Sequence, residues 1–201
     1  MSSVSTTVAA HGHRPVRRNT RFGNGFLGVI FFLLSEVALF GSLIFAYLYL
    51  RRSLPTWPPP GIPKLEVVLP AINTVVLVTS GFFCHYAYTA VKHGKQRLFM
   101  VLLLLTIVFG AAFLSGQAIE YKSLWLRTTI NHDIFGATFF TLTGLHGAHV
   151  SLGVLALIGV FMLGLRGHWT RDHNFAVHGV TLYWHFVDAV WVVLFFIFYL
   201  V

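Results

Sequence analysis

Five long apolar segments, separated by short polar stretches, dominate the hydropathy pattern of this chain. Each reaches the roughly 20 residues that an α-helix needs to cross the hydrocarbon of a bilayer, and none shows the strict alternation of a barrel strand. Only helices and closed barrels satisfy their backbone groups in lipid. The pattern therefore predicts an all-α integral membrane protein, a bundle of five transmembrane helices. The predicted helices span residues 26–50, 67–91, 98–119, 134–165 and 175–201.

The composition supports a membrane domain. Hydrophobic residues make up 56% of the chain and charged residues 10%, whereas soluble domains carry about 25% charged residues. Residues 1–24 differ, because they are polar, free of acidic residues and rich in arginine. We expect them to form a disordered or extended cytoplasmic tail ahead of a membrane domain at 25–201. The net charge of +8 is spread over the loops, so it does not indicate nucleic-acid binding.

Lysine and arginine are distributed unevenly between the two sides of the predicted bundle. The tail and the loops on its side carry nine of them, and the loops on the opposite side carry five. Loops rich in Lys and Arg remain in the cytoplasm. This distribution predicts a cytoplasmic N-terminus and a C-terminus outside. Trp57 and Trp125 fall in the outer loops, where indole rings suit the membrane interface.

Ionisable side chains within the apolar segments are the candidates for chemistry. Each is costly in hydrocarbon and needs a partner. His185 and Asp188 are three residues apart in the last segment, and His146 and His149 are three apart in the fourth, so each pair shares one helical face. Glu36 lies about ten residues into the first predicted helix, at roughly 15 Å of depth, which is near the middle of the bilayer.

Three uses of this polar set are open. A metal site is chemically possible with imidazole and carboxylate ligands, but the chain has no Glu-x-x-His pair and no His-Glu-x-x-His motif. The single cysteine, Cys84, excludes an internal disulfide and a cysteine metal site.

A proton or ion path is the second use, but the polar residues form no ladder across the bilayer. We predict the third use, in which buried polar groups bond to one another and hold the helices together, each bond contributing about 0.6 kcal/mol. The residues of this predicted set are Glu36, His146, His149, His185 and Asp188. We predict no catalytic residue and no metal or redox cofactor in this chain.

Several motifs occur in a fixed order along the chain. They are Leu34-Ser35-Glu36-Val37, Trp57-Pro58-Pro59, Leu69-Pro70 with Ile72-Asn73-Thr74, Glu120-Tyr121, Gly136-Ala137-Thr138-Phe139-Phe140, Thr143-Gly144-Leu145-His146-Gly147-Ala148-His149-Val150, and Tyr183-Trp184-His185-Phe186-Val187-Asp188. Together these motifs resemble subunit III of the haem-copper terminal oxidases, the cytochrome c oxidase subunit III family, in its five-helix bacterial form. The resemblance covers nearly all of the chain after the tail.

The resemblance implies a non-catalytic subunit of a proton-pumping cytochrome c oxidase. Such a subunit packs on subunit I, lies in one complex with subunit II and other oxidase subunits, and takes part in catalysis only through that complex. Haem and copper lie in the partner subunits, and cytochrome c donates electrons. The family binds phospholipid and sustains proton uptake and stability during oxygen reduction. On this resemblance we assign Glu36 and Trp57 to lipid binding, and the five-residue polar set to structure and proton uptake.

Other assignments remain open at this stage. A quinol oxidase and a nitric oxide reductase can contain a similar five-helix subunit. A self-contained membrane metalloenzyme or transporter is the remote alternative. Longer relatives carry two additional leading helices, which other subunits could replace here. The five-helix form favours a multi-pass protein of the bacterial plasma membrane.

Overall fold

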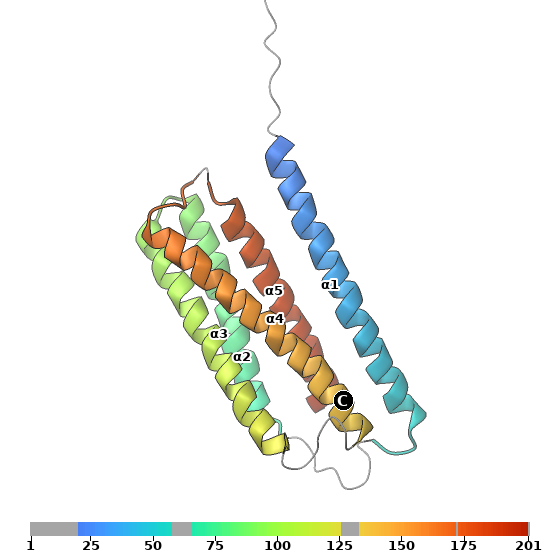
Figure 1. Ribbon diagram of the computed structural model, residues 1–201. Coiled ribbons are helices and arrows are strands. Elements are labelled where there is room, and N and C mark those ends of the chain that lie inside the picture. Colours follow the sequence, from blue (N-terminus) through green and yellow to red (C-terminus); the bar gives the residue numbers. More distant parts are fainter. Residues whose placement is uncertain (1–19, 58–65, 126–132, 172, 201) are drawn as a thin grey trace, which may run out of the picture.

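The computed structural model describes residues 20–57, 66–125, 133–171 and 173–200. Over these ranges the chain forms five long α-helices and one closing π-helical turn, with no strand (Figure 1). The elements are α1 (Thr20–Ser53), α2 (Val68–Lys92), α3 (Gln96–Trp125), α4 (Ile134–Leu165), α5 (Phe175–Phe195) and η1 (Phe196–Leu200). All five helices are long and apolar enough to cross a membrane. The predicted all-α, five-helix membrane fold is confirmed. The sides on which the termini lie stay a prediction.

Two helices extend further into polar sequence than hydropathy predicted. The first begins at Thr20, six residues before its predicted start at residue 26. Residues 1–19 of the predicted tail lie outside the described residues. The third helix continues to Trp125, past its predicted end at residue 119. Hydropathy marks the part of a helix that lies in hydrocarbon, but backbone hydrogen bonding continues until a cap or a breaker intervenes.

Local sequence explains several of the observed helix ends. Pro55 follows the end of α1 closely, and a proline disfavours helical backbone in the residue before it. Gly94 adopts a positive φ of 71° in the tight turn between α2 and α3, a conformation open to glycine. Asp133 caps α4 by accepting the Gly136 N–H at 2.5 Å.

Helices α2 to α5 form a four-helix bundle, and α1 lies along one side of it (Figure 1). Within the bundle α2 pairs with α3, α3 with α4, and α5 packs on both α2 and α4. Among the described helices, α1 packs on α4 and α5. The first helix is therefore attached to the last two rather than to its neighbour in sequence.

The centre of the bundle is the fully buried Trp184 of α5. Its indole ring passes between Gly110 of α3 and Gly153 of α4, and a methyl group added at either glycine would come within 2.8 Å of the ring. The indole N–H donates to Ser80 Oγ of α2 at 3.0 Å. One side chain thus reaches three neighbouring helices, because the two glycines leave the room that its ring fills.

A second tryptophan of α5 repeats this arrangement further along the helix. The Trp191 indole N–H donates to Thr74 Oγ1 of α2 at 2.9 Å. The Trp191 ring packs edge-on against Phe113 of α3, with ring centroids 4.8 Å apart. It also stacks on His146 of α4 at 5.2 Å. These contacts orient the faces of α4 and α5 that carry the predicted polar set.

Candidate functional site

A carboxyl–imidazole hydrogen bond joins α1 to α4. Glu36 Oε2 lies 2.9 Å from His149 Nε2. The other ring nitrogen of His149, Nδ1, lies 2.8 Å from the Leu145 carbonyl oxygen. A carbonyl only accepts, so Nδ1 carries a proton and donates it. The Glu36–His149 contact then contains one proton between its two atoms. The pair has no net charge, whether an acid donates to imidazole or an imidazolium donates to carboxylate.

Other groups of the bundle fix this pair in position. The side chains of His149 and Glu36 are 12% and 15% exposed. The Phe40 ring lies 5.0 Å from the His149 ring. The Tyr183 hydroxyl of α5 donates to the His149 backbone carbonyl at 3.0 Å. The pair therefore lies where α1, α4 and α5 meet.

One narrow stripe attaches α1 to the bundle. Glu36, Phe40 and Tyr47 are spaced to share one helical face, and Phe40 and Tyr47 are 2% and 1% exposed. The Tyr47 hydroxyl donates to the Ile197 carbonyl of η1 at 3.3 Å, and Arg51 donates to the same oxygen at 3.3 Å. Most of the other large apolar side chains of α1 are exposed. The stripe thus combines the Glu36–His149 bond near the middle of α1, the packing of the Phe40 and Tyr47 rings, and two hydrogen bonds near the end of the helix.

His146 lies inside the bundle, where it is 1% exposed. Neither of its ring nitrogens has a hydrogen-bond partner among the described residues. Its ring is surrounded by aromatic rings, with Trp191, Phe113 and Phe40 at 5.2, 5.9 and 6.5 Å. His146 and His149 are three residues apart, so their side chains differ in direction by about 60° around the axis of α4. This difference directs His149 toward α1 and His146 toward α5.

Asp188 and His185 lie together on the face that α5 turns to α2. Asp188 Oδ2 is 3.9 Å from His185 Nδ1, which is beyond hydrogen-bond distance. Asp188 Oδ1 has no hydrogen-bond partner in the described part of the chain. Gly81 of α2 makes room for this carboxyl, because a methyl group at Gly81 would collide with Asp188 Oδ2. The two residues border a hollow of about 240 Å³, with the His85 ring 5.9 Å from the His185 ring.

The five predicted residues therefore occupy three separate places. The structure brings Glu36 to His149 across two helices, keeps His185 beside Asp188 on one helix, and surrounds His146 with rings. Over the described ranges, no group of three or more His, Cys, Asp or Glu side chains is arranged to hold a metal ion. The arrangement can hold helices together. The one hydrogen bond between helices within the predicted set, Glu36–His149, attaches α1 to α4.

The two residues assigned to lipid binding, Glu36 and Trp57, lie at different positions along the axis of α1. Trp57 follows α1, and its ring packs against Tyr47 at 5.6 Å and Phe135 at 5.7 Å. It therefore joins the end of α1 to the beginning of α4. Glu36 lies 17 residues before the end of α1 at Ser53, which is about 25 Å of helix. The structure does not bring Glu36 and Trp57 together.

A buried polar cluster around Glu120 is not part of the predicted polar set. The Tyr199 hydroxyl of η1 donates to Glu120 Oε1 at 2.6 Å, and Gln117 Nε2 donates to Oε2 at 3.4 Å. The Asn73 amide of α2 occupies the space left beside Gly116 of α3. The available signal was the spacing of Gln117 and Glu120, which places both on one face of a continuing helix.

Comparison with known proteins identifies the family. The family model described as cytochrome c oxidase subunit III matches residues 3–201. Cytochrome c oxidase subunit 3 of Synechocystis sp. is 39% identical over 205 residues, which covers 100% of this chain and 83% of the relative. The protein of the same name from Thermostichus vulcanus is 39% identical over 206 residues, covering 100% and 96%. That of Hippopotamus amphibius is 35% identical over 197 residues, covering 94% and 72%. The chain belongs to the cytochrome c oxidase subunit III family.

Proposed function

We propose that this chain is the non-catalytic third subunit of a proton-pumping cytochrome c oxidase, packed directly on subunit I in a bacterial plasma membrane. The observation that carries the proposal is the full-length match to relatives named cytochrome c oxidase subunit 3. In this proposal haem and copper lie in partner subunits and cytochrome c supplies the electrons. The chain sustains proton uptake and the stability of the oxidase during oxygen reduction.

The Glu36–His149 bond supports a structural role in that complex. It joins two helices without adding net charge to the hydrocarbon, where a lone charge is costly. It keeps α1 at a fixed position on α4 and α5. A subunit that supports its neighbour over many turnovers needs a surface that does not shift, and the stripe keeps α1 in place on the bundle. Phospholipid bound beside Glu36, where α1 meets α4, completes the proposed surface.

Removal of the chain from the purified oxidase tests the proposal. We expect the remaining core to reduce oxygen at first and then to lose activity in fewer turnovers, because it lacks its support. Adding the purified chain back should restore the number of turnovers before inactivation. The measurements are oxygen consumption over time and protons released per electron. A core that matches the intact oxidase in both would overturn the proposal.

The electron donor is tested on the same preparation. Reduced cytochrome c and a quinol are supplied separately to the complex that contains this chain. We expect oxygen consumption with cytochrome c, because the relatives reported above carry that oxidase name. Oxygen consumption with quinol alone would assign the chain to a quinol oxidase instead.

A further inference from the structure

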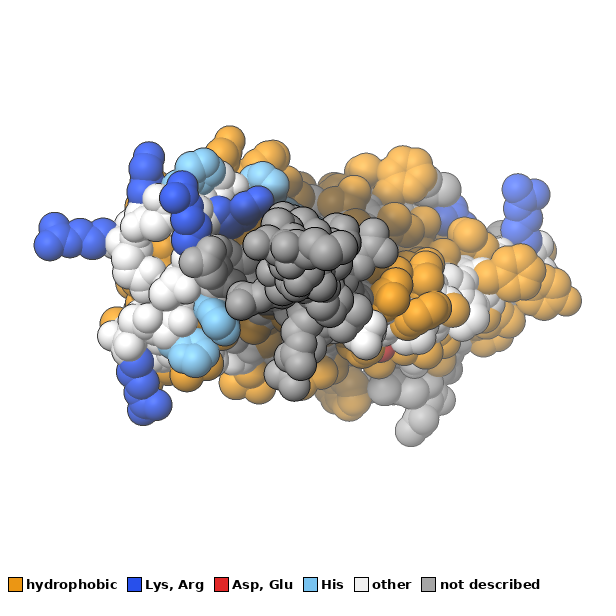
Figure 2. All heavy atoms as spheres, turned by 90° about the horizontal axis from the view of Figure 1, so that it is seen from above, with side chains coloured by type: hydrophobic (Ala, Val, Ile, Leu, Met, Phe, Trp, Pro, Cys, Tyr) orange, Lys and Arg blue, Asp and Glu red, His pale blue; other side chains and the backbone are white. Residues whose placement is uncertain are grey.

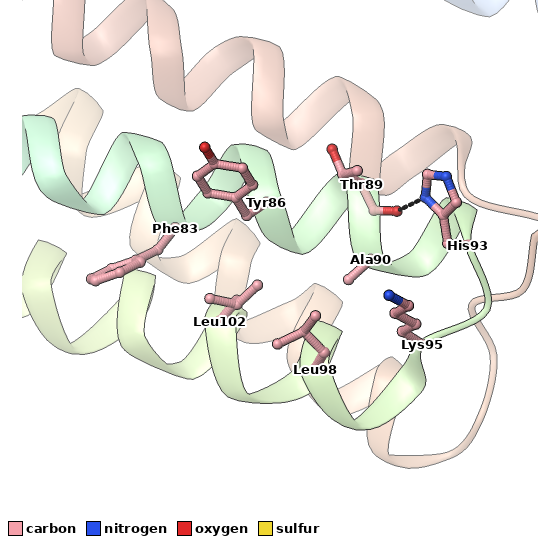
Figure 3. Close-up of a pocket in the computed structure, with 8 residues that line it drawn as sticks. All are labelled: Phe83, Tyr86, Thr89, Ala90, His93, Lys95, Leu98 and Leu102. Carbon is pink, nitrogen blue, oxygen red and sulfur yellow. Dashed lines mark hydrogen bonds between the residues drawn. The ribbon is translucent and has the colours of Figure 1, made fainter.

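An apolar groove runs along the α2–α3 hairpin beside its turn (Figure 3). It has a volume of about 360 Å³ and is formed by Phe83, Tyr86 and Ala90 of α2 together with Leu98 and Leu102 of α3. The lining does not include any residue of α1, so the groove is separate from the stripe around Glu36. Ala90 is only 4% exposed, and its small side chain leaves space between the larger side chains around it.

The end of the groove at the turn is cationic. Figure 3 shows Lys95 and His93 on this side of the groove. His93 Nδ1 bonds to the Thr89 carbonyl at 2.8 Å, which leaves Nε2 for another partner. No described side chain pairs with the Lys95 ammonium group. Lys92 differs, because its ammonium group lies 5.3 Å from the Tyr88 ring.

The described residues around the groove carry the same charge. Among the described residues at this end of the bundle none is acidic, and Figure 2 shows lysine and arginine side chains around its rim. The basic residues of the two turns here are Lys92, Lys95, Arg97, Arg166 and Arg171. Basic residues at the ends of membrane helices attract anionic lipids. The charge therefore favours a negative group at the mouth of the groove.

The opposite end of the groove is apolar. From Ala90 to Phe83 the groove follows seven residues of α2, which is about 10 Å of helix. There the Phe83 ring packs edge-on against Phe109 of α3, with centroids 5.3 Å apart. A ligand that fits needs a negative head at the turn and a hydrocarbon chain along the helices. A glycerophospholipid with an anionic headgroup has that form.

We propose that this groove binds one anionic glycerophospholipid. Its phosphate lies against Lys95 and His93, and one acyl chain lies between Tyr86 and Leu98. This site is independent of the lipid proposed beside Glu36, and it does not depend on the electron donor of the oxidase.

Lipid retention by the intact oxidase complex tests this site. The detergent-solubilised complex is delipidated, incubated with phosphatidylglycerol or with phosphatidylcholine of the same acyl chains, and weighed by native mass spectrometry. We expect the complex to retain one more phosphatidylglycerol than phosphatidylcholine. Lys95→Ala should weaken that binding about fivefold, the effect of about 1 kcal/mol for each basic residue at an anionic surface.

Two further variants separate a site from a diffuse surface charge. Arg166→Ala removes an exposed cation at the same end that does not line the groove, and should weaken retention less than Lys95→Ala does. Leu98→Trp fills the groove from a side chain that is 46% exposed, so it spares the core and should abolish retention of the extra lipid. Equal losses in Lys95→Ala and Arg166→Ala would overturn the proposal. Equal retention of the two lipids, or a cross-link from Leu98→Cys to another subunit, would also overturn it.

Discussion

Helix α1 and the bundle of α2 to α5 are held by different means. In the most apolar 18-residue window of α1, 6% of the window is buried inside the molecule. In the corresponding window of Phe175–Leu200, which comprises α5 and η1, the buried share is 44%. The bundle closes by tight packing around Trp184, whereas α1 is attached by the carboxyl–imidazole bond, two buried aromatic side chains and the hydrogen bonds that Tyr47 and Arg51 donate to Ile197. Lipid tails are as apolar as the helices and provide no hydrophobic drive for their association. A helix with a small interface therefore depends more on each directional polar bond than a closely packed helix does, although the bundle also contains such bonds.

Replacing Trp184 should have the largest effect and should break the bundle. Trp184→Ala removes the ring between Gly110 and Gly153 and leaves a cavity, at a cost of about 3–5 kcal/mol. We expect a marked fall in the unfolding midpoint of the detergent-solubilised oxidase, followed by circular dichroism. If this variant were no less stable than one altered at Glu36, the bundle would not be the more tightly packed region.

Adding one methyl group should test the tightness of the packing directly. Gly153→Ala places a carbon 2.8 Å from the Trp184 ring, and overpacking of this kind costs about 1–3 kcal/mol. Gly159 of the same helix is the matched control, because a methyl group there meets no atom within 4 Å. Gly159→Ala should be neutral or slightly stabilising, since alanine is the better helix former. Equal midpoints for the two variants would refute tight packing at Gly153.

Removing the Glu36 carboxyl should loosen α1 and leave the bundle intact. Glu36→Ala deletes the bond to His149, and such bonds contribute about 0.6 to 1.7 kcal/mol in membrane proteins. We expect faster amide hydrogen exchange in α1, measured by mass spectrometry, and unchanged exchange in α2 and α3. Equal acceleration in all helices would show that the two regions are not held separately.

Glu36→Gln should have the smallest effect. The glutamine amide can donate to His149 Nε2, because the proton on Nδ1 already engages the Leu145 carbonyl. We expect exchange in α1 to remain close to that of the natural protein, and the loss of one carboxylic acid band from the infrared spectrum. An infrared spectrum that keeps all its carboxylic acid bands would mean that the pair consists of carboxylate and imidazolium, and loosening as large as that of Glu36→Ala would show that the amide does not replace the carboxyl.

Much of the fold could be predicted from the sequence, because length and apolarity determine how many helices span a membrane. Which polar side chains bond to each other between helices was harder to predict. Glu36 and His149 were both in the predicted set, but spacing alone did not show that His149, and not His146, faces α1. That choice depends on how Trp191 and Phe113 orient α4, which is a tertiary effect.

The Glu120 cluster was missed for two physical reasons. Its helix continues to Trp125, whereas hydropathy placed the end at residue 119, one residue before Glu120. Its partner Tyr199 lies 79 residues further along the chain, and no local pattern connects the two. The motifs that indicated the family include Trp184 and His146, both of which lie inside the bundle.

The attachment of α1 has a consequence for the biogenesis of the protein. The first helix enters the bilayer before any of its intramolecular partners exist, because it packs on α4 and α5 and reaches the Ile197 carbonyl of η1. During translation its apolar exterior keeps it stable among lipids as a separate span. The final position of α1 is set only after the fifth helix has been inserted, so the first and last parts of the chain are assembled together.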